Sequence, residues 1–227
     1  MPSQPLLVAD DVSKSFGATH ALTGASLDVF PGEVLALTGP SGSGKSTLLH
    51  CLSGILAPNS GQVVYDGRDL GAMNDRDRSA LRREAFGFVF QFGQLVPELT
   101  CLENVALPLR LAGVRRRRAE QRASELLNQL GVAEVGGKRP GQTSGGQGQR
   151  VAVARALITG PRVIFADEPT GALDSRTGDQ VMRLLVAAAK ERGSAVVLVT
   201  HEARIASCAD REVAFRDGAV VTAAVMR

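Results

Sequence analysis

Nine consecutive residues restrict the fold more than any other stretch: a glycine- and serine-rich loop that ends in lysine, serine and threonine. The loop follows a run of strand-forming residues, Val34 to Thr38, and it leads into a segment whose leucines recur at helical spacing. The glycines allow a tight turn that points successive N–H groups inward, and the start of the following helix adds positive potential. A strand, a loop and a helix in this order predict a phosphate-binding loop. Its residues are Gly39, Pro40, Ser41, Gly42, Ser43, Gly44, Lys45, Ser46 and Thr47.

Two side chains of this loop have the chemistry to bind a nucleoside triphosphate. We expect Lys45 to reach the β- and γ-phosphates and the Ser46 hydroxyl to ligate Mg²⁺. The alternative is a chance glycine turn before a helix. The complete G-x-x-x-x-G-K-S spacing between a strand and a helix disfavours that alternative.

The composition describes one ordinary globular domain. The chain has 227 residues, of which 44% are hydrophobic, and its formal net charge of +3 is too small to indicate a nucleic-acid partner. The cysteines Cys51, Cys101 and Cys208 are odd in number and widely spaced, so we expect reduced thiols. No leader pattern and no apolar run long enough to span a bilayer is visible. We expect a cytoplasmic protein whose membrane role comes through a partner.

The arginines form one dense cluster, Arg115 to Arg118, immediately before an amphipathic pattern. The favoured interpretation is the solvated start of a helix. Contact with anionic lipid headgroups is a sharper alternative, and nucleic-acid binding is the third.

The order of periodic segments predicts an α/β fold: a P-loop, RecA-like core with an antiparallel β subdomain and an inserted helical subdomain. The core and β subdomain are expected at residues 1–91 and 149–227, and the helical subdomain at 92–148, within a single domain of residues 1–227. In the helical part, Pro108 is expected to kink or end the first helix. The other expected elements are antiparallel strands within 6–38, a first helix carrying Leu48, Leu49, Leu52, Ile55 and Leu56 on one face, a strand at 62–65, an apolar run at 86–90, helices at 117–130, 149–158 and 176–192, strands at 163–166 and 195–200, and a hairpin turning at 217–218.

An apolar strand in the second half ends in two acids, Asp167 and Glu168. We expect Asp167 to hold Mg²⁺ through water and Glu168 to polarise the attacking water. Two acids after a strand are weak support alone, because such a pair is usually a surface pair. The phosphate-binding loop upstream favours the catalytic interpretation.

A second serine-glycine loop, formed by Ser144, Gly145, Gly146 and Gln147, precedes another helix. Its N–H groups and the Ser144 hydroxyl have the chemistry to bind a second set of phosphate oxygens. One nucleotide does not easily occupy two separate anion loops in a small domain. We therefore expect each loop to serve a nucleotide held by another copy of the chain.

Taken in order, these motifs resemble those of an ABC-transporter nucleotide-binding domain, over nearly the whole chain. The resemblance implies that Phe16 stacks on adenine, although the family more often has tyrosine there. It implies that Gln91 contacts Mg²⁺ and links the site to the membrane partner, that Asp174 lies at a dimer interface, and that His201 contacts the γ-phosphate. Each residue also has a plain structural alternative: Phe16 in the core, Gln91 and His201 at the surface. Thr143 and Gly148 depart from the family pattern, which has leucine and often glutamine there.

The resemblance is strongest to the ATPases of lipoprotein-release, macrolide-efflux and cell-division systems. It implies an ATPase that binds ATP and Mg²⁺, forms a homodimer sandwiching two ATP, and drives separate permease subunits from the cytoplasmic face of the membrane. The apolar loop at 92–99, with Leu95 and Leu99, is expected to be the permease patch rather than to pack internally. A soluble ABC-type ATPase acting on nucleic acid or ribosomes is the alternative, and a regulator without turnover is disfavoured by Glu168 and His201. No nucleic-acid partner is expected.

Overall fold

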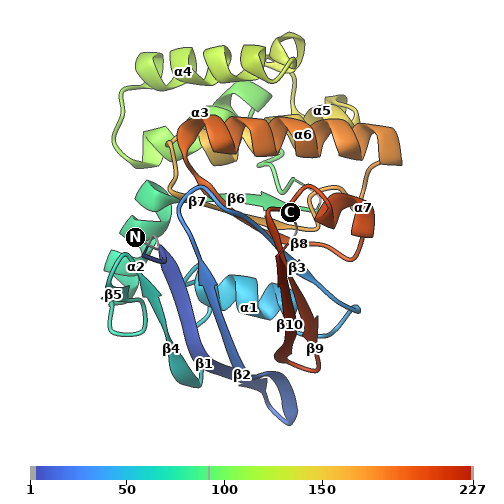
Figure 1. Cartoon of the computed structure of the whole chain (residues 1–227). Coiled ribbons are helices and arrows are strands. Elements are labelled where there is room, and N and C mark those ends of the chain that lie inside the picture. The colour runs from blue at the N-terminus through green and yellow to red at the C-terminus, as the bar shows by residue number, and fades with distance from the viewer. Residues whose placement is uncertain (1–3, 92, 226–227) are drawn as a thin grey trace.

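Two β-sheets form the framework of the computed structural model, which describes residues 4–91 and 93–225 (Figure 1). A six-stranded sheet has the order β10-β9-β3-β8-β7-β6, in which all neighbours are parallel except β10 and β9. A four-stranded antiparallel sheet has the order β2-β1-β4-β5. Helix α1 lies between the two sheets, and α3, α4, α5 and α6 cover the opposite face of the six-stranded sheet. This layering confirms the predicted α/β class with an antiparallel β part.

The elements have the following bounds. The strands are β1 (Leu7–Phe16), β2 (Thr19–Val29), β3 (Val34–Thr38), β4 (Ser60–Tyr65), β5 (Arg68–Asp69), β6 (Phe86–Phe90), β7 (Val163–Asp167), β8 (Ala195–Val199), β9 (Arg211–Arg216) and β10 (Ala219–Val225). The α-helices are α1 (Lys45–Leu52), α2 (Asp75–Ala85), α3 (Cys101–Leu111), α4 (Arg116–Gln129), α5 (Gly145–Leu157), α6 (Ser175–Arg192) and α7 (Ala203–Ala206). Short 3₁₀ turns lie at Ala133–Val135 and Pro140–Gln142.

Strand β3 shows how one sequence pattern builds two cores. Val34 and Ala36 belong to the core beneath helices α3 to α6, whereas Leu35 and Leu37 belong to the core between the two sheets. Successive side chains of a strand point to opposite faces, so a continuous apolar run buries both faces of a central strand. The phosphate-binding loop therefore starts from a strand that is fixed on both sides.

Several predicted boundaries were wrong. Helix α5 begins at Gly145 rather than at 149, because Ser144 and Gln147 form a capping box that starts the helix earlier. The predicted domain boundary at residue 148 consequently falls inside α5. Helix α1 ends at Leu52, so Ile55 does not lie on its buried face and is 44% exposed. Helix α3 does not end at Pro108 but runs to Leu111, since proline removes only one backbone hydrogen bond and the capping box of Thr100 with Glu103 fixes the helix start. A kink at Pro108 stays a prediction.

Helix α2 was missed because its sequence is almost entirely polar. Asn74 caps it through a hydrogen bond from the Asp77 N–H, and Asp75 and Asp77 stand in the first turn with arginines in the last. The helix is stabilised at its ends rather than by an apolar stripe, and none of its side chains is buried. Hydrophobic periodicity therefore gave no signal.

The arginine cluster and the cysteines have the predicted character. Arg115 to Arg118 are exposed at the start of α4, where Arg116 pairs with Glu120 at 2.6 Å and with Glu103 at 3.6 Å. The cysteines are free thiols, and burial raises the pKa of Cys51 to about 11. None of the helices in the described part of the chain is long and apolar enough to cross a membrane.

Candidate nucleotide-binding and hydrolysis site

The phosphate-binding loop wraps around its own lysine. Lys45 is only 5% exposed, and its Nζ donates to the carbonyl oxygens of Gly39 at 2.9 Å and Pro40 at 2.7 Å. Burial lowers the pKa of Lys45, while the negative charges of Glu168 and Asp167 act in the opposite direction. The ammonium group is thus held at the floor of the loop by carbonyls that a phosphate oxygen can replace.

Two glycines of the loop are required by close backbone approach. A Cβ on Gly39, whose φ is +143°, would lie 2.0 Å from the Phe215 carbonyl oxygen of β9. A Cβ on Gly44, whose φ is +104°, would lie 2.3 Å from the Ala21 carbonyl oxygen of β2. Gly44 is also the N-cap of α1, and no side chain caps that helix. The first N–H groups of α1 are therefore left to an external anion.

Asp167 lies directly beside the loop. The Ser46 hydroxyl donates to Asp167 Oδ1 at 2.9 Å, which joins the first turn of α1 to the last residue of β7. Strand β3, which leads into the loop and α1, and strand β7, which carries Asp167, are separated by β8 alone, and all three run parallel. Their carboxyl ends meet at one edge of the sheet, which is where ligands bind in open α/β sheets.

Glu168 has an unusual backbone and a half-satisfied side chain. Its φ is +46°, in the left-handed region, which costs a non-glycine residue roughly 1–3 kcal/mol, and its N–H donates to the Val199 carbonyl at 3.0 Å. One carboxylate oxygen, Oε1, pairs with His201 Nδ1 at 2.7 Å. The other, Oε2, is buried without a hydrogen-bond partner among the described residues. An unpaired buried carboxylate oxygen fits a group that accepts a proton from a bound water.

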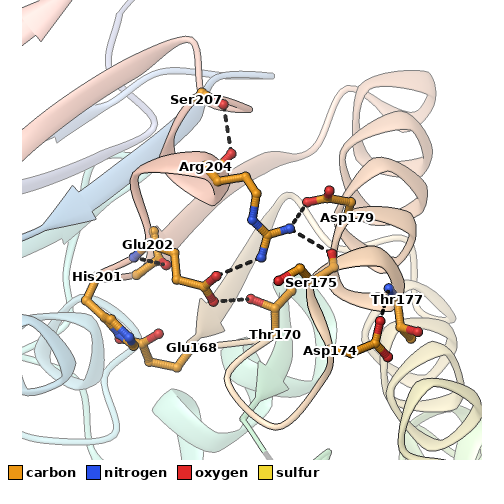
Figure 2. A network of polar contacts seen from close by, with 11 residues as sticks. Glu168, Thr170, Asp174, Ser175, Thr177, Asp179, His201, Glu202, Arg204 and Ser207 are labelled. Atoms are coloured by element: carbon orange, nitrogen blue, oxygen red, sulfur yellow. Dashed lines mark hydrogen bonds and ion pairs between the residues drawn. The ribbon is translucent and has the colours of Figure 1, made fainter.

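His201 is joined to this carboxylate but reaches solvent. Its side chain is 56% exposed, and the hydrogen bond and negative charge of Glu168 raise the pKa of His201 (Figure 2). The histidine therefore lies at the open side of the site, in contact with the acid that we expect to be catalytic.

Gln91 lies at the same edge of the sheet. It follows β6, whose last residue, Phe90, pairs with Asp167 of β7. A Cβ on Gly171 would lie 2.7 Å from Gln91 Nε2, so the amide contacts the loop that follows Glu168. The position is half-buried and follows directly on β6, the strand beside β7.

Phe16 lies at the end of β1 and is 50% exposed, with Lys14 Nζ 5.6 Å above its ring. The alternative that it is a core residue is therefore wrong. An exposed aromatic ring beside a cation has the surface that a nucleobase needs for stacking.

The second serine-glycine loop opens to a separate cavity. Ser144 caps α5: its hydroxyl accepts from the Gln147 N–H at 3.3 Å, and its own N–H donates to Gln147 Oε1 at 3.0 Å. Asp174 caps α6 by accepting from the Thr177 N–H at 3.1 Å, and this hydrogen bonding lowers the pKa of Asp174. Together they border a cavity of about 460 Å³ whose lining includes Ser144, Gly145, Gly146, Gln147, Arg150 and Asp174.

The two departures from the family pattern contact each other. Thr143 Oγ1 donates to the Pro140 carbonyl at 2.8 Å, and a Cβ on Gly148 would lie 3.3 Å from that hydroxyl oxygen. A small residue at 148 thus leaves room for the polar residue at 143. Neither alters Ser144 or Gly146.

The structure brings Lys45, Ser46, Asp167, Glu168 and His201 together, and it places Ser144 and Asp174 at a different cavity. Sequence reasoning missed the neighbours of His201, above all Arg204 and Glu202. A pairing between α7 and α6 is a tertiary contact with no spacing rule, so no signal in the sequence indicated it. In the described part of the chain, no three His, Cys, Asp or Glu side chains group closely enough to hold a metal on their own.

A buried lysine in a glycine loop, with a serine and a strand-end aspartate beside it, defines a P-loop nucleoside triphosphatase. The family model described as "ABC transporter" matches residues 22–171, more than half of the chain. The chain therefore belongs to the ABC transporter family, and it is an ATP-binding subunit with ATPase activity.

Two relatives represent the group that the motifs predicted. The lipoprotein-releasing system ATP-binding protein LolD 2 of Caulobacter vibrioides is 46% identical over 220 residues, covering 95% of this chain and 96% of that protein. The macrolide export ATP-binding/permease protein MacB of Marinobacter nauticus is 44% identical over 225 residues, covering 97% of this chain but 35% of that protein. The chain thus spans about a third of the length of the latter relative.

A solved structure supports dimer formation and ATP turnover by this type of chain. The ATP-binding cassette MJ0796, described as dimeric and in a post-hydrolysis state with ADP and Pi, has a TM-score of 0.90 and 38% identity, covering 97% of this chain and 99% of that chain. Taken together, the comparisons favour a transporter subunit over a soluble ATPase acting on nucleic acid or ribosomes.

Proposed function

We propose that this chain hydrolyses ATP at Glu168, and that closure of a homodimer around two ATP molecules drives a separate membrane permease. The observation that carries the proposal is the buried Glu168 Oε2, which has no hydrogen-bond partner among the described residues. Glu168 directly follows Asp167, which contacts Ser46, and its charge acts on Lys45 of the phosphate-binding loop. Glu168 accepts a proton from the attacking water, and His201, held on the other carboxylate oxygen, contacts the γ-phosphate.

Lys45 and the loop amides bind the β- and γ-phosphates, and Phe16 stacks on the adenine. Ser46, Asp167 and Gln91 supply the neutral and anionic oxygen donors that Mg²⁺ prefers. Ser46 and Asp167 already contact each other, and Gln91 follows the strand residue that pairs with Asp167, which fits that ion bound together with phosphates. When bound, Mg²⁺ neutralises the developing charge on the phosphate oxygens.

The cavity beside Ser144 receives the nucleotide held by the second copy. It contains the N–H groups and hydroxyl of the signature loop, formed by Ser144, Gly145, Gly146 and Gln147, with Asp174 at its border, but it contains neither Lys45 nor Glu168. An anion-binding loop without its own lysine is complete only when a second phosphate-binding loop faces it.

A groove near α3 is the proposed permease site. It has a volume of about 570 Å³ and includes Ile55, Phe88, Phe90, Pro108 and Leu111 in its lining, with arginines at its margin. Ile55 and Leu111 are large apolar side chains that are nevertheless exposed, at 44% and 63%. An apolar groove with a basic margin suits a short amphipathic helix with acidic flanks, presented by the permease on the cytoplasmic face of the membrane.

The predicted patch at Leu95 and Leu99 does not line this groove. Leu95 is half-buried and packs against the core beneath α3 to α6, and the backbone around Val96 is tied to the Asn104 side chain at 2.7 and 3.0 Å. Both leucines are half-buried, so they offer less apolar surface than the groove, and the expectation that they form the permease patch stays a prediction beside it. Of the described loop residues 93–99, Gln94 borders the groove.

The hydrolytic role is tested by Glu168→Gln in the purified chain. We expect ATP binding to persist and steady-state phosphate release to fall by at least a hundredfold, since an amide is not a proton acceptor of comparable strength. Phosphate release near the wild-type rate would remove Glu168 from the role of base.

The groove is tested by Ile55→Glu combined with Leu111→Glu, with the exposed Val221→Glu as the matched control. We expect the double variant to keep its basal ATPase activity and to lose co-purification with its permease. A double variant that co-purifies as well as Val221→Glu would place the permease elsewhere.

A further inference from the structure

Arg204, three residues after His201, contacts the start of α6 and also Glu202 in its own segment. It lies on α7, and its Nη1 donates to the Ser175 carbonyl at the first residue of α6 at 2.8 Å and to the carboxylate of Asp179 one turn later. Its Nη2 donates to Glu202 Oε2 at 2.7 Å. Figure 2 shows the guanidinium between these acceptors.

Glu202 extends the contact to the loop after β7. Its other oxygen, Oε1, accepts from the Thr170 hydroxyl at 3.3 Å, and Thr170 is buried only two residues after Glu168. The Glu202 N–H in turn donates to Thr200 Oγ1 at 3.1 Å, next to His201. The line Thr170, Glu202, Arg204, Asp179 therefore joins the loops that carry Glu168, His201 and Asp174.

The guanidinium suits this position better than an ammonium group would. Its donors have a fixed planar arrangement, so two nitrogens can hold acceptors on two different segments at once. The Arg204 side chain is partly exposed, which weakens each ion pair, but fixed acceptor positions still restrict how the three loops move relative to one another.

We propose that Arg204 is a positioning residue for hydrolysis: it fastens the segment after His201 to the start of α6 and to the loop after Glu168, so that these loops move as one unit. The inference rests on the hydrolytic roles proposed for Glu168 and His201. It adds a residue that touches neither nucleotide nor water in this role and that acts by fixing the Glu168–His201 pair relative to Asp174.

The test is Arg204→Ala in the full chain, with steady-state ATPase kinetics and nucleotide binding. We expect kcat to fall about ten- to a hundredfold, because small displacements of catalytic groups have effects of that size. The KM for ATP and the monomer's affinity for ATP stay within about twofold, since Lys45 and the loop amides are untouched. Arg183→Ala, an exposed arginine on α6, is the matched control and keeps wild-type kcat.

Arg204→Lys keeps the charge and replaces the planar fork by a single nitrogen. We expect it to recover part of the lost kcat, and to supply the same comparison if Arg204→Ala does not fold. Full wild-type kcat in Arg204→Lys would overturn the proposal, because the fork would then have no role.

A double-mutant cycle with Asp179→Asn separates positioning from general stability. If the two residues act as one unit, the double variant loses no more kcat than Arg204→Ala alone, whereas independent effects multiply. Multiplying losses, an unchanged kcat in Arg204→Ala, or a KM that rises in step with the loss of kcat would each overturn the proposal. If wild-type hydrolysis does not depend on Glu168, the proposed function itself fails, which the Glu168→Gln variant reports separately.

Discussion

The phosphate-binding loop at Gly39–Thr47 and the signature loop at Ser144–Gln147 both lead into a helix, yet they leave different groups free. Gly44 gives α1 no side-chain cap, so the first N–H groups of that helix have no side chain to bind. At α5, Ser144 and Gln147 each accept the other's N–H, which satisfies two donors within the loop. The first loop also contains a buried cation, Lys45, and the second does not.

This difference indicates that the two loops have different roles: the first determines how tightly the monomer binds ATP, and the second determines how the dimer closes. An uncapped helix start with its own lysine has the free donors and charge to hold a triphosphate in one chain. A capped loop is rigid before any ligand arrives and offers fewer donors, so it suits a second contact made across a dimer. The signature loop is therefore expected to add little to the affinity of the monomer and much to the stability of the dimer.

The largest effect is expected from Lys45→Ala. Loss of a buried charged donor to phosphate costs about 2–5 kcal/mol, so the ATP affinity of the monomer should fall about thirtyfold or more. Calorimetric titration of ATP into the monomer measures it. Affinity within a factor of three of wild type would mean that the loop amides alone hold the nucleotide.

Ser144→Arg should produce the opposite pattern. The long cation fills the cavity beside Asp174 and blocks ATP-driven dimer formation in a Glu168→Gln background, while the ATP affinity of the monomer changes less than twofold. Sedimentation with and without ATP measures the dimer, and Asn128→Arg on the exposed face of α4 is the control. Equal losses of monomer affinity in Ser144→Arg and Lys45→Ala would show that both loops act within one chain.

Glycine substitutions extend the comparison to packing. A Cβ on Gly39 would strike the backbone oxygen of Phe215 at 2.0 Å, whereas a Cβ on Gly146 would strike Thr177 Cγ2, a side-chain methyl, at 2.4 Å. We expect Gly146→Ala to lower the free energy of unfolding by about 1–3 kcal/mol. The double variant Gly146→Ala with Thr177→Ser should regain this stability, because serine lacks that methyl group. Gly39→Ala should lose ATP binding with no comparable side-chain rescue.

Denaturant unfolding of these three variants, with Thr177→Ser alone as the reference for the double variant, measures these costs. A Gly146→Ala loss that persists in the Thr177→Ser background would locate the strain in the backbone of α5. Gly146 would then resemble Gly39, where a second substitution in a neighbouring side chain does not relieve the steric clash.

The sequence predicted the parts of the site whose chemistry is local. The loop Gly39–Thr47 and the acids after β7 carry their spacing in one continuous stretch, so their placement followed from strand and helix order. The start of α5 was placed four residues late, because the glycines of the signature loop resemble a turn and the Ser144–Gln147 capping box was not used. The groove at Ile55 and Leu111 was not predicted, because its residues come from segments far apart in the sequence.

Contacts between distant segments had no sequence signal at all. The guanidinium of Arg204 meets Asp179 and Ser175 only because α6 and α7 pack at the edge of the sheet. The polar helix α2 had the same difficulty, since its stability comes from caps rather than from a periodic apolar face. Local motifs therefore predicted which residues bind and hydrolyse the nucleotide. Tertiary packing determines which other residues hold those groups in position.

The smallest expected effect concerns His201. This histidine pairs with Glu168 near the phosphate-binding loop, and the described lining of the signature-loop cavity contains no histidine. The hydrogen bond and charge of Glu168 raise the pKa of His201 above its ordinary value of about 6.5. A raised pKa means that the charged pair contributes below the unfolded pKa and is lost as pH rises through the folded pKa. Because the side chain is largely exposed, the pKa itself is a better observable than stability.

Glu168→Gln replaces the carboxylate by an uncharged amide, so the pKa of His201 should fall back toward its ordinary value. A titration of the imidazole resonances by NMR measures this change, and Glu191→Gln at the exposed end of α6 is the control for a general loss of negative charge. A His201 pKa that is equally raised in both variants would mean that Glu168 does not hold the histidine in solution. Glu168 would then not fix His201 beside the phosphate-binding loop. Arg204 would in that case position only the loop that follows Glu168.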